Sequence, residues 1–136
     1  MNQAISLLKK KNARITRARE AVISIIFEAN FPLDAPTIIS KLNSKNIKVN
    51  KTTVYRELDF LLKNGLLKLV FLKPSIVHYE SALLPHHHHL VCTNCDSIEE
   101  VDCVIDEDKL LKKVEKKGFN LKNHKFEMYG VCASCI

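Results

Sequence analysis

Two Cys-x-x-Cys pairs, far apart in the sequence, constrain the second half of this chain more than any other feature. They are Cys92–Cys95 and Cys132–Cys135. Each short loop can present two sulfurs at about 2.3 Å from one ion, so the four thiolates predict a tetrahedral zinc site that joins the two segments. The other interpretation is two disulfides, which the zinc-ribbon type of the pairing and the lack of a signal-peptide pattern at residues 1–14 disfavour.

Four consecutive histidines, residues 86–89, stand just before the first cysteine pair. In an extended strand, successive side chains point to opposite faces. His86 and His88 are therefore expected on one face, and His87 and His89 on the other. One short strand can thus supply ligands to two further metal centres. The remaining thiol, Cys103, has no partner at ligand spacing, and we expect it to be idle.

The charged residues divide the chain into two unlike halves. With 136 residues, the whole chain is long enough for one ordinary domain or two small ones. Residues 1–73 contain 14 Lys+Arg and 5 Asp+Glu, and residues 74–136 contain 7 and 10. The basic half predicts a module that binds a polyanion, although a solvated basic surface without a ligand is the alternative. No long apolar span occurs, so we expect a cytoplasmic protein that does not cross a membrane.

Helical spacing of apolar residues predicts four helices in the basic half. They span residues 2–11, 17–28, 35–44 and 51–63, the third capped by Asp34 with Pro36 in its first turn. Two apolar runs, residues 66–72 and 76–80, flank a turn and predict a β-hairpin. Helices followed by such a hairpin are typical of a winged helix-turn-helix domain, which we assign to residues 1–80.

The fourth predicted helix has one apolar and one polar face. The apolar residues, expected in the core, are Val54, Leu58, Leu61 and Leu62. On the polar face, Tyr55 offers a ring to thymine methyls and Arg56 can pair with guanine or phosphate. Phosphates near the helix start can be held by Lys51, Thr52 and Thr53. Plain solvated helices have similar faces, but the basic half and the hairpin favour DNA binding.

A linker is expected at residues 81–86 and a small α/β domain at residues 87–136. The pattern predicts strands at residues 88–92, 98–101 and 120–129, and a helix at residues 106–117 that ends before Gly118. So short a domain buries little apolar surface by itself, and we expect it to need zinc and a partner subunit. The predicted fold class is therefore α+β.

As a set, these motifs resemble the ferric uptake regulator family of bacterial metal-dependent repressors. The matching elements are Arg14-x-Thr16-x-x-Arg19, Thr52-Thr53-Val54-Tyr55-Arg56, residues 86–89, Cys92-x-x-Cys95, Asn123-His124 and Tyr129-Gly130-x-Cys132-x-x-Cys135. The resemblance implies an N-terminal winged helix, a C-terminal dimerisation domain, and a homodimer on pseudo-palindromic double-stranded DNA.

The resemblance also implies roles for individual residues. Cys92, Cys95, Cys132 and Cys135 match the structural zinc site. A regulatory metal is expected at Glu80, His87, His89 and Glu100. A second metal is expected at His86, His88, Glu107 and His124. The DNA-binding set is Arg14, Thr16, Arg19, Lys51, Thr52, Thr53, Tyr55 and Arg56, with Arg14 in the minor groove.

Two departures from the family leave the sensed metal open. Many relatives supply an additional histidine ligand where this chain has Pro32, and His78 is a candidate to replace it. Zinc sensors often have a cysteine between the positions of Glu80 and His86, which this chain lacks. Mixed carboxylate and imidazole ligands suit iron, zinc or manganese. Glu100 disfavours peroxide sensing, because that subclass tends to have aspartate there.

The predicted function is a metal-activated repressor of metal-uptake genes, with iron as the first candidate for the sensed metal. The alternatives are a zinc sensor, then a peroxide regulator, then a constitutive zinc-stapled DNA-binding protein. We do not expect an enzyme, because four thiolates leave no open zinc position for water. The H-x-E element of zinc deaminases also does not occur in the sequence.

Overall fold

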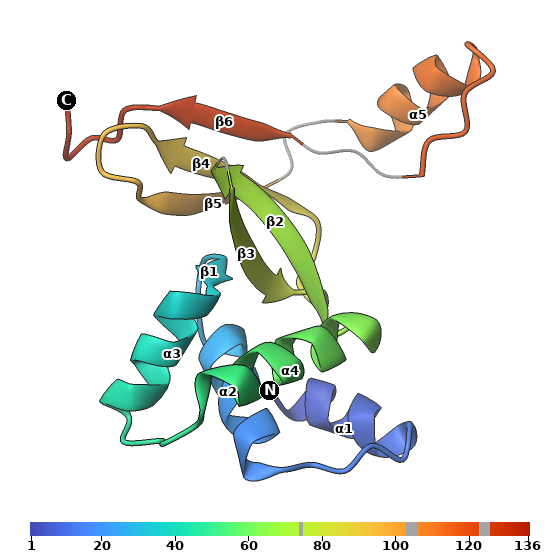
Figure 1. Ribbon diagram of the computed structural model, residues 1–136. Helices are drawn as coiled ribbons and strands as arrows, with labels where there is room; N and C mark the ends of the chain where they lie inside the picture. Colours follow the sequence, from blue (N-terminus) through green and yellow to red (C-terminus); the bar gives the residue numbers. More distant parts are fainter. Residues whose placement is uncertain (74, 103–105, 123–125) are drawn as a thin grey trace. The chain divides into compact units, whose positions relative to one another are not determined.

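The computed structural model of the chain describes residues 1–73, 75–102, 106–122 and 126–136. These residues form two compact units, Met1–Leu84 and Pro85–Ile136. Each unit combines helix and sheet, which confirms the α+β class (Figure 1). None of the helices in the described ranges is long and apolar enough to cross a membrane.

The first unit is built from helices and a small antiparallel sheet. Its elements are α1 (Asn2–Lys10), α2 (Arg17–Phe27), β1 (Leu33–Asp34), α3 (Ala35–Ser44), α4 (Lys51–Lys63), β2 (Leu67–Lys73) and β3 (Ile76–Ser81). The four helices and the hairpin confirm the predicted elements to within a residue or two at each end. Strand β1 was not predicted, since the sequence around Pro32 reads only as a break.

The helices of the first unit begin where short polar side chains accept a backbone hydrogen bond. The Thr16 hydroxyl accepts from the Arg19 amide at 3.2 Å, and an Asp34 carboxylate oxygen accepts from the Thr37 amide at 2.9 Å. Gly65 follows the C-terminal end of helix α4, and its φ of 71° suits a residue without a side chain. Local chemistry therefore sets these boundaries.

The core of the first unit lies between helices α1, α2, α3 and α4. Its fully buried side chains include Leu8, Val22, Ile23, Ile38, Leu42, Val54, Leu58 and Leu61. The predicted apolar face of α4 is confirmed, except that Leu62 is only partly buried. One charged residue, Glu57, is buried on this side of the helix with 6% exposure. Its position was not predicted.

The sheet of the first unit has the strand order β1-β3-β2, with antiparallel neighbours. Strands β2 and β3 form a hairpin that follows α4 in the chain (Figure 1). Strand β1 pairs with β3 through Leu33 opposite Tyr79 and Asp34 opposite His78. This pairing attaches the hairpin to the segment that leads into α3, which gives a winged-helix architecture.

The second unit contains β4 (His87–Cys92), β5 (Ile98–Asp102), α5 (Glu107–Glu115) and β6 (Glu127–Gly130). Strand β4 is central, antiparallel to β5 and parallel to β6. The last strand was predicted from residue 120, but residues 119–122 form no strand and β6 begins at Glu127. Cys103 and His124 lie outside the described residues.

Apolar burial is sparse in the second unit. Among its described residues, the buried hydrophobic side chains are Val91 and Cys92. Larger apolar side chains remain at its surface, with Tyr129 55% exposed and Val131 45% exposed. The described part of this unit therefore has little hydrophobic core, and other interactions must contribute to its stability.

Candidate functional site

The parallel pairing of β4 and β6 brings the two Cys-x-x-Cys pairs together. Cys92, the last residue of β4, lies opposite Gly130, the last residue of β6. The Thr93 amide donates a hydrogen bond to the Gly130 carbonyl at 2.7 Å and extends this contact past the strand ends. Because both strands end at the same edge of the sheet, the turn that follows each one places its cysteines there.

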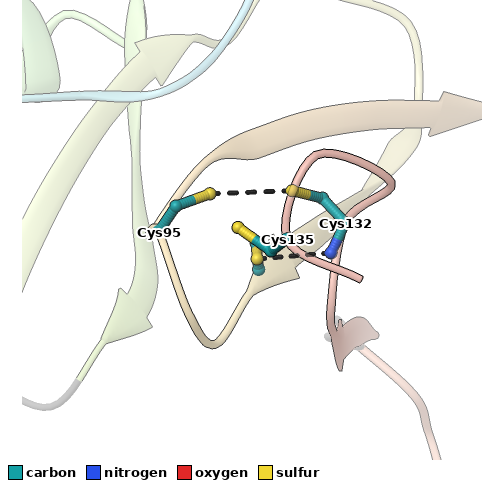
Figure 2. Close-up of side chains that lie close together, drawn as sticks. Cys95, Cys132 and Cys135 are labelled. Carbon is teal, nitrogen blue, oxygen red and sulfur yellow. Dashed lines mark hydrogen bonds between the residues drawn. The ribbon is translucent and has the colours of Figure 1, made fainter.

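The four cysteine sulfurs of these turns form one cluster. The sulfurs of Cys92, Cys95, Cys132 and Cys135 all lie within 4.8 Å of one another. Figure 2 shows Cys95 and Cys132 with their sulfurs turned toward each other, 3.7 Å apart. Tetrahedral coordination with metal–sulfur bonds of about 2.3 Å requires sulfurs about 3.8 Å apart. All four cysteines are free, so the disulfide interpretation is wrong for this structure.

Backbone amides stabilise negative charge on the first cysteine of the cluster. The Cys132 amide donates to the Cys92 sulfur at 3.3 Å, and with the amides of Cys95 and Asn94 it lowers the pKa of the Cys92 thiol to about 6. Hydrogen bonds with Cys95 and Cys132 raise the pKa of Cys135 to about 12. Four close thiols thus resist complete ionisation, and a divalent cation is the partner that makes four thiolates compatible. The donor set fits zinc.

A serine beside the cluster was not singled out in the sequence. The hydroxyl of Ser97 lies 3.4 Å from the Cys95 sulfur, and the Ser97 side chain and backbone lower the pKa of Cys95. The Ser97 carbonyl also accepts a hydrogen bond from the Cys92 amide at 2.9 Å. Ser97 therefore supports both cysteines of the first pair. The sequence signal that could have identified Ser97 was its position, two residues after Cys95.

The histidines alternate between the faces of β4 as predicted. The rings of His87 and His89 lie side by side with centroids 4.9 Å apart, and those of His86 and His88 are separated by the same distance. Glu100 on β5 lies opposite His89, and its carboxylate oxygen is 3.9 Å from Nε2 of His87. Within this unit, three residues of the expected regulatory set are thus brought together.

Hydrogen bonds to carbonyl oxygens orient two of these imidazoles. Nδ1 of His87 lies 2.8 Å from the Pro85 carbonyl, and Nδ1 of His88 lies 3.1 Å from the Phe126 carbonyl. A carbonyl oxygen only accepts, so Nδ1 of each ring donates a proton to it, which leaves Nε2 as the lone-pair nitrogen of the neutral imidazole. This is the arrangement in which metal-ligating histidines are held by a backbone acceptor.

The remaining expected ligands belong to other elements or fall outside the described residues. Glu80 belongs to β3 of the first unit, where its carboxylate contacts the Lys68 ammonium at 2.8 Å. His78 lies two residues earlier on the same strand, opposite Asp34. Glu107 is the first residue of α5, and His124 is outside the described residues.

The polar face of α4 carries most of the expected DNA contacts. Lys51, Thr52 and Arg56 are exposed, Thr53 is half-buried, and the Tyr55 ring is 41% exposed. Before α2, the Arg14 side chain is exposed, while Thr16 caps that helix. The first unit therefore presents two exposed groups. One is the segment before α2 that contains Arg14, called the Arg14 segment, and the other is the polar face of α4 with Lys51, Thr52, Tyr55 and Arg56, called the α4 face.

Arg19 differs from the other residues of the expected DNA-binding set. Its side chain is only 11% exposed, and its Nε donates to a Glu57 carboxylate oxygen at 2.7 Å. Sequence reasoning missed Glu57 as its partner. A signal existed, since Glu57 stands three residues after Val54, on the apolar stripe of α4 where a lone carboxylate needs a cationic partner.

A winged helix joined to a unit rich in thiolate and imidazole ligands defines a metal-responsive transcriptional regulator. The family model of the ferric uptake regulator family matches residues 10–129. The chain therefore belongs to the ferric uptake regulator family. Transcriptional regulator FurA of Mycobacterium tuberculosis is 31% identical over 128 residues, which is 94% of this chain and 86% of that protein.

Solved structures agree with this assignment. The Helicobacter pylori ferric uptake regulator, described as having three functional metal binding sites, is 26% identical with a TM-score of 0.79, over 98% of this chain and 89% of that one. A zinc uptake regulator complexed with zinc and DNA is also 26% identical, with a TM-score of 0.68 over 98% and 91%. The chain is thus similar to iron and zinc regulators alike.

Proposed function

We propose that this protein is a homodimeric, metal-activated repressor that binds double-stranded DNA and controls genes of metal-ion uptake. The observation that carries the proposal is the division of labour in the chain. One unit is basic and exposes a helix face, with Lys51, Tyr55 and Arg56, that is suited to a major groove. The other gathers three groups of metal-binding side chains. The relatives named ferric uptake regulators support iron as the sensed metal.

For the cysteine cluster we propose a structural zinc ion. Four thiolates suit zinc and leave no coordination position open. Bound there, zinc would supply a fixed tetrahedral centre that ties the ends of β4 and β6. Cys92 and Cys95 would hold it from one side of the sheet edge, and Cys132 and Cys135 from the other.

We propose His87, His89, Glu100 and Glu80 as the regulatory ligands. The first three lie together on β4 and β5, and the family resemblance adds Glu80 from the first unit. Ligands drawn from both units would make DNA binding depend on metal. Such control requires that the metal favour the DNA-binding arrangement over other arrangements of the two units.

His86 and His88 support a second metal site on the opposite face of β4. The resemblance adds Glu107 and His124 to this set. The cysteines and the two histidine pairs make three groups of metal-binding side chains. The Helicobacter pylori protein is likewise described as having three metal binding sites. We therefore propose that this protein also has three sites, each with a separate role.

Apolar surface supports a homodimer formed by the second unit. A cavity of about 350 Å³ beside the cysteine cluster is lined by Leu90, Met128, Tyr129 and Val131, among others. Leu90, Tyr129 and Val131 are more than one-third exposed in the single chain. Contiguous apolar surface of this kind is often an interface. A dimer would present two α4 helices to successive major grooves of a pseudo-palindrome.

The decisive experiment is a titration of DNA affinity against Fe²⁺, Zn²⁺ and Mn²⁺, with iron kept anaerobic. The wild type should gain affinity with one of the ions. His89→Ala should lose this response while keeping its dimer and its cysteine-bound zinc. His78→Ala should reduce the response less, and the size of its effect shows whether His78 adds a ligand. If wild type and His89→Ala respond alike to every ion, the regulatory assignment is wrong.

The same titration separates the alternatives. Activation by zinc alone would identify a zinc sensor, which the similar zinc uptake regulator makes the second candidate. Loss of DNA binding after peroxide treatment would identify a peroxide regulator. DNA binding that no ion changes would identify a constitutive DNA-binding protein in which zinc is structural.

The DNA-binding face has its own test. Arg56→Ala should weaken operator binding by about 1–3 kcal/mol while leaving the fold intact, because Arg56 is exposed and a good base contact is worth that much. Binding should also weaken steeply with salt, because a basic unit releases counterions from DNA. Unchanged affinity in Arg56→Ala would contradict the role of α4.

A further inference from the structure

The guanidinium of Arg19, a residue of α2, contacts both α4 and the segment that precedes α2. Its Nε donates to a Glu57 carboxylate oxygen at 2.7 Å, and one terminal nitrogen donates to the Arg14 carbonyl at 2.6 Å. Its central carbon lies 3.5 Å from the centre of the Phe60 ring. Glu57 and Phe60 belong to α4, while Arg14 belongs to the segment before α2.

These contacts use features that arginine alone combines. Its planar group donates hydrogen bonds in several directions and stacks on an aromatic face at the same time. A lysine has one charged centre and cannot reproduce the separated donors. The Arg19 and Glu57 side chains are only 11% and 8% exposed, so the pair is shielded from water. Such a buried pair fixes geometry more strongly than an exposed one does.

The contacts of Arg19 link the two exposed groups of the first unit. The Arg14 main chain is held by Arg19 while its side chain is exposed. On α4, Glu57 is buried, and the half-buried Phe60 lies one turn after the exposed Arg56, on the same side of the helix. A shift of the guanidinium therefore displaces the Arg14 segment relative to α4.

We infer that Arg19 is a positioning residue for DNA binding. It holds the Arg14 segment at a fixed place relative to α4, so that Arg14 and the α4 face engage one DNA site together. The inference rests on the proposed DNA-binding function. The positioning role takes the place of the expected direct contact between Arg19 and DNA, because the guanidinium would have to leave Glu57 and Phe60 to make that contact.

A double-mutant cycle tests this role. The probe is a duplex that the metal-loaded wild type selects from a random-sequence library, and all affinities are measured at one salt concentration. Arg14→Ala should weaken binding of the otherwise wild-type protein about fivefold or more, as expected for loss of a good contact. In an Arg19→Lys background, Arg14→Ala should weaken binding less than about twofold, because the segment is already misplaced.

Arg17→Lys is the matched control, since Arg17 is an exposed arginine in the same turn of α2. In that background, Arg14→Ala should retain its full effect. A role limited to fold stability would lower the melting temperature of Arg19→Lys but leave the effect of Arg14→Ala unchanged. A direct phosphate contact would be largely preserved in Arg19→Lys, because lysine also binds phosphate. Either result would overturn the inference.

Glu57→Gln provides a second route if Arg19→Lys does not fold. This substitution keeps the shape of the side chain and removes its charge, and Glu57 is too buried to contact DNA itself. It should reduce the effect of Arg14→Ala in the same direction as Arg19→Lys. An unchanged Arg14→Ala effect in the Glu57→Gln background would reject the positioning role. If the wild type binds no DNA with any ion, the proposed function fails instead.

Discussion

The two units of this chain are stabilised in different ways. In the first unit, apolar residues from α1, α2, α3 and α4 are buried together in one cluster. In the described part of the second unit, buried hydrophobic residues are limited to Val91 and Cys92, and four cysteine sulfurs converge instead. Stability is distributed over many side chains in the first unit, whereas the proposed zinc site would concentrate it in four thiolates in the second.

This difference follows from the energies involved. A buried Leu or Ile contributes about 1.5–3 kcal/mol, so a core of many such residues can lose one of them and persist. A structural zinc site contributes on the order of 10–16 kcal/mol, and it depends on every ligand. The first unit should therefore respond gradually to substitution, and the second should respond in an all-or-none manner.

Removal of one cysteine should give the largest effect. Cys132→Ser should lose the bound zinc and destabilise the second unit by several kcal/mol, because three thiolates cannot complete the site. Elemental analysis together with hydrogen exchange of the β4 amides measures both effects. Cys103→Ser is the control and should keep its zinc. Full zinc occupancy and unchanged exchange in Cys132→Ser would remove the contrast between the units.

A cavity in the core of the first unit should have the next largest effect. Leu61→Ala should lower the free energy of unfolding by about 2–5 kcal/mol, because Leu61 is fully buried. Zinc content should not change. The matched control, Leu69→Ala, removes a side chain that is 39% exposed and should cost about 1 kcal/mol or less. Equal losses in both variants would show that the core is not where this unit gains its stability.

The cap of α3 should have a moderate effect that depends on pH. Burial alone would raise the pKa of Asp34, but hydrogen bonds from Thr37 outweigh it and leave the pKa below its ordinary value of 3.8. Asp34→Ala should cost about 0.5–2 kcal/mol at neutral pH.

The sign of the pH dependence follows from the lowered pKa. The Asp34 carboxylate contributes this part of the stability above pH 3.8, and the contribution is lost as the pH falls through the lower folded value. Hydrogen exchange of α3 amides, compared between wild type and Asp34→Asn, should show a difference that changes only in this acid range. A difference that varies mainly near neutral pH would contradict this account.

The exposed ion pair on α4 should have the smallest effect. Lys63 and Asp59 are 2.6 Å apart, but their side chains are 74% and 61% exposed. Lys63→Ala should therefore cost only about 0.3–0.5 kcal/mol, and less at high salt. Chemical denaturation at two salt concentrations measures it. A loss comparable to that of Leu61→Ala would mean that surface charge, not the core, stabilises the first unit.

Features determined by neighbouring residues could be predicted from the sequence. The caps at Thr16 and Asp34 and the end of α4 before Gly65 depend on one or two side chains and the backbone beside them. The convergence of the cysteines was predictable for another reason, because zinc chemistry leaves few other uses for two such pairs. Periodicity also identified the exposed and buried faces of α4.

Features that depend on distant partners could not be predicted in this way. Strand β1 exists because Leu33 lies opposite Tyr79, and β6 begins at Glu127 because that residue lies opposite His89. The placement of Arg19 depends on Glu57, which is 38 residues further along the chain. No local pattern encodes such pairings, so they become visible only when the fold is known.

The parallel pairing of β4 and β6 also affects how the chain can fold during synthesis. Cys92 and the residue that donates to it, Cys132, are 40 positions apart. At about 5–20 residues per second, translation separates them by about 2–8 seconds. The first unit can fold in that interval, since its core is already complete. During this interval the thiols of Cys92 and Cys95 have no second cysteine pair with which to share a metal ion. A newly made chain should therefore be most sensitive to oxidants at this stage.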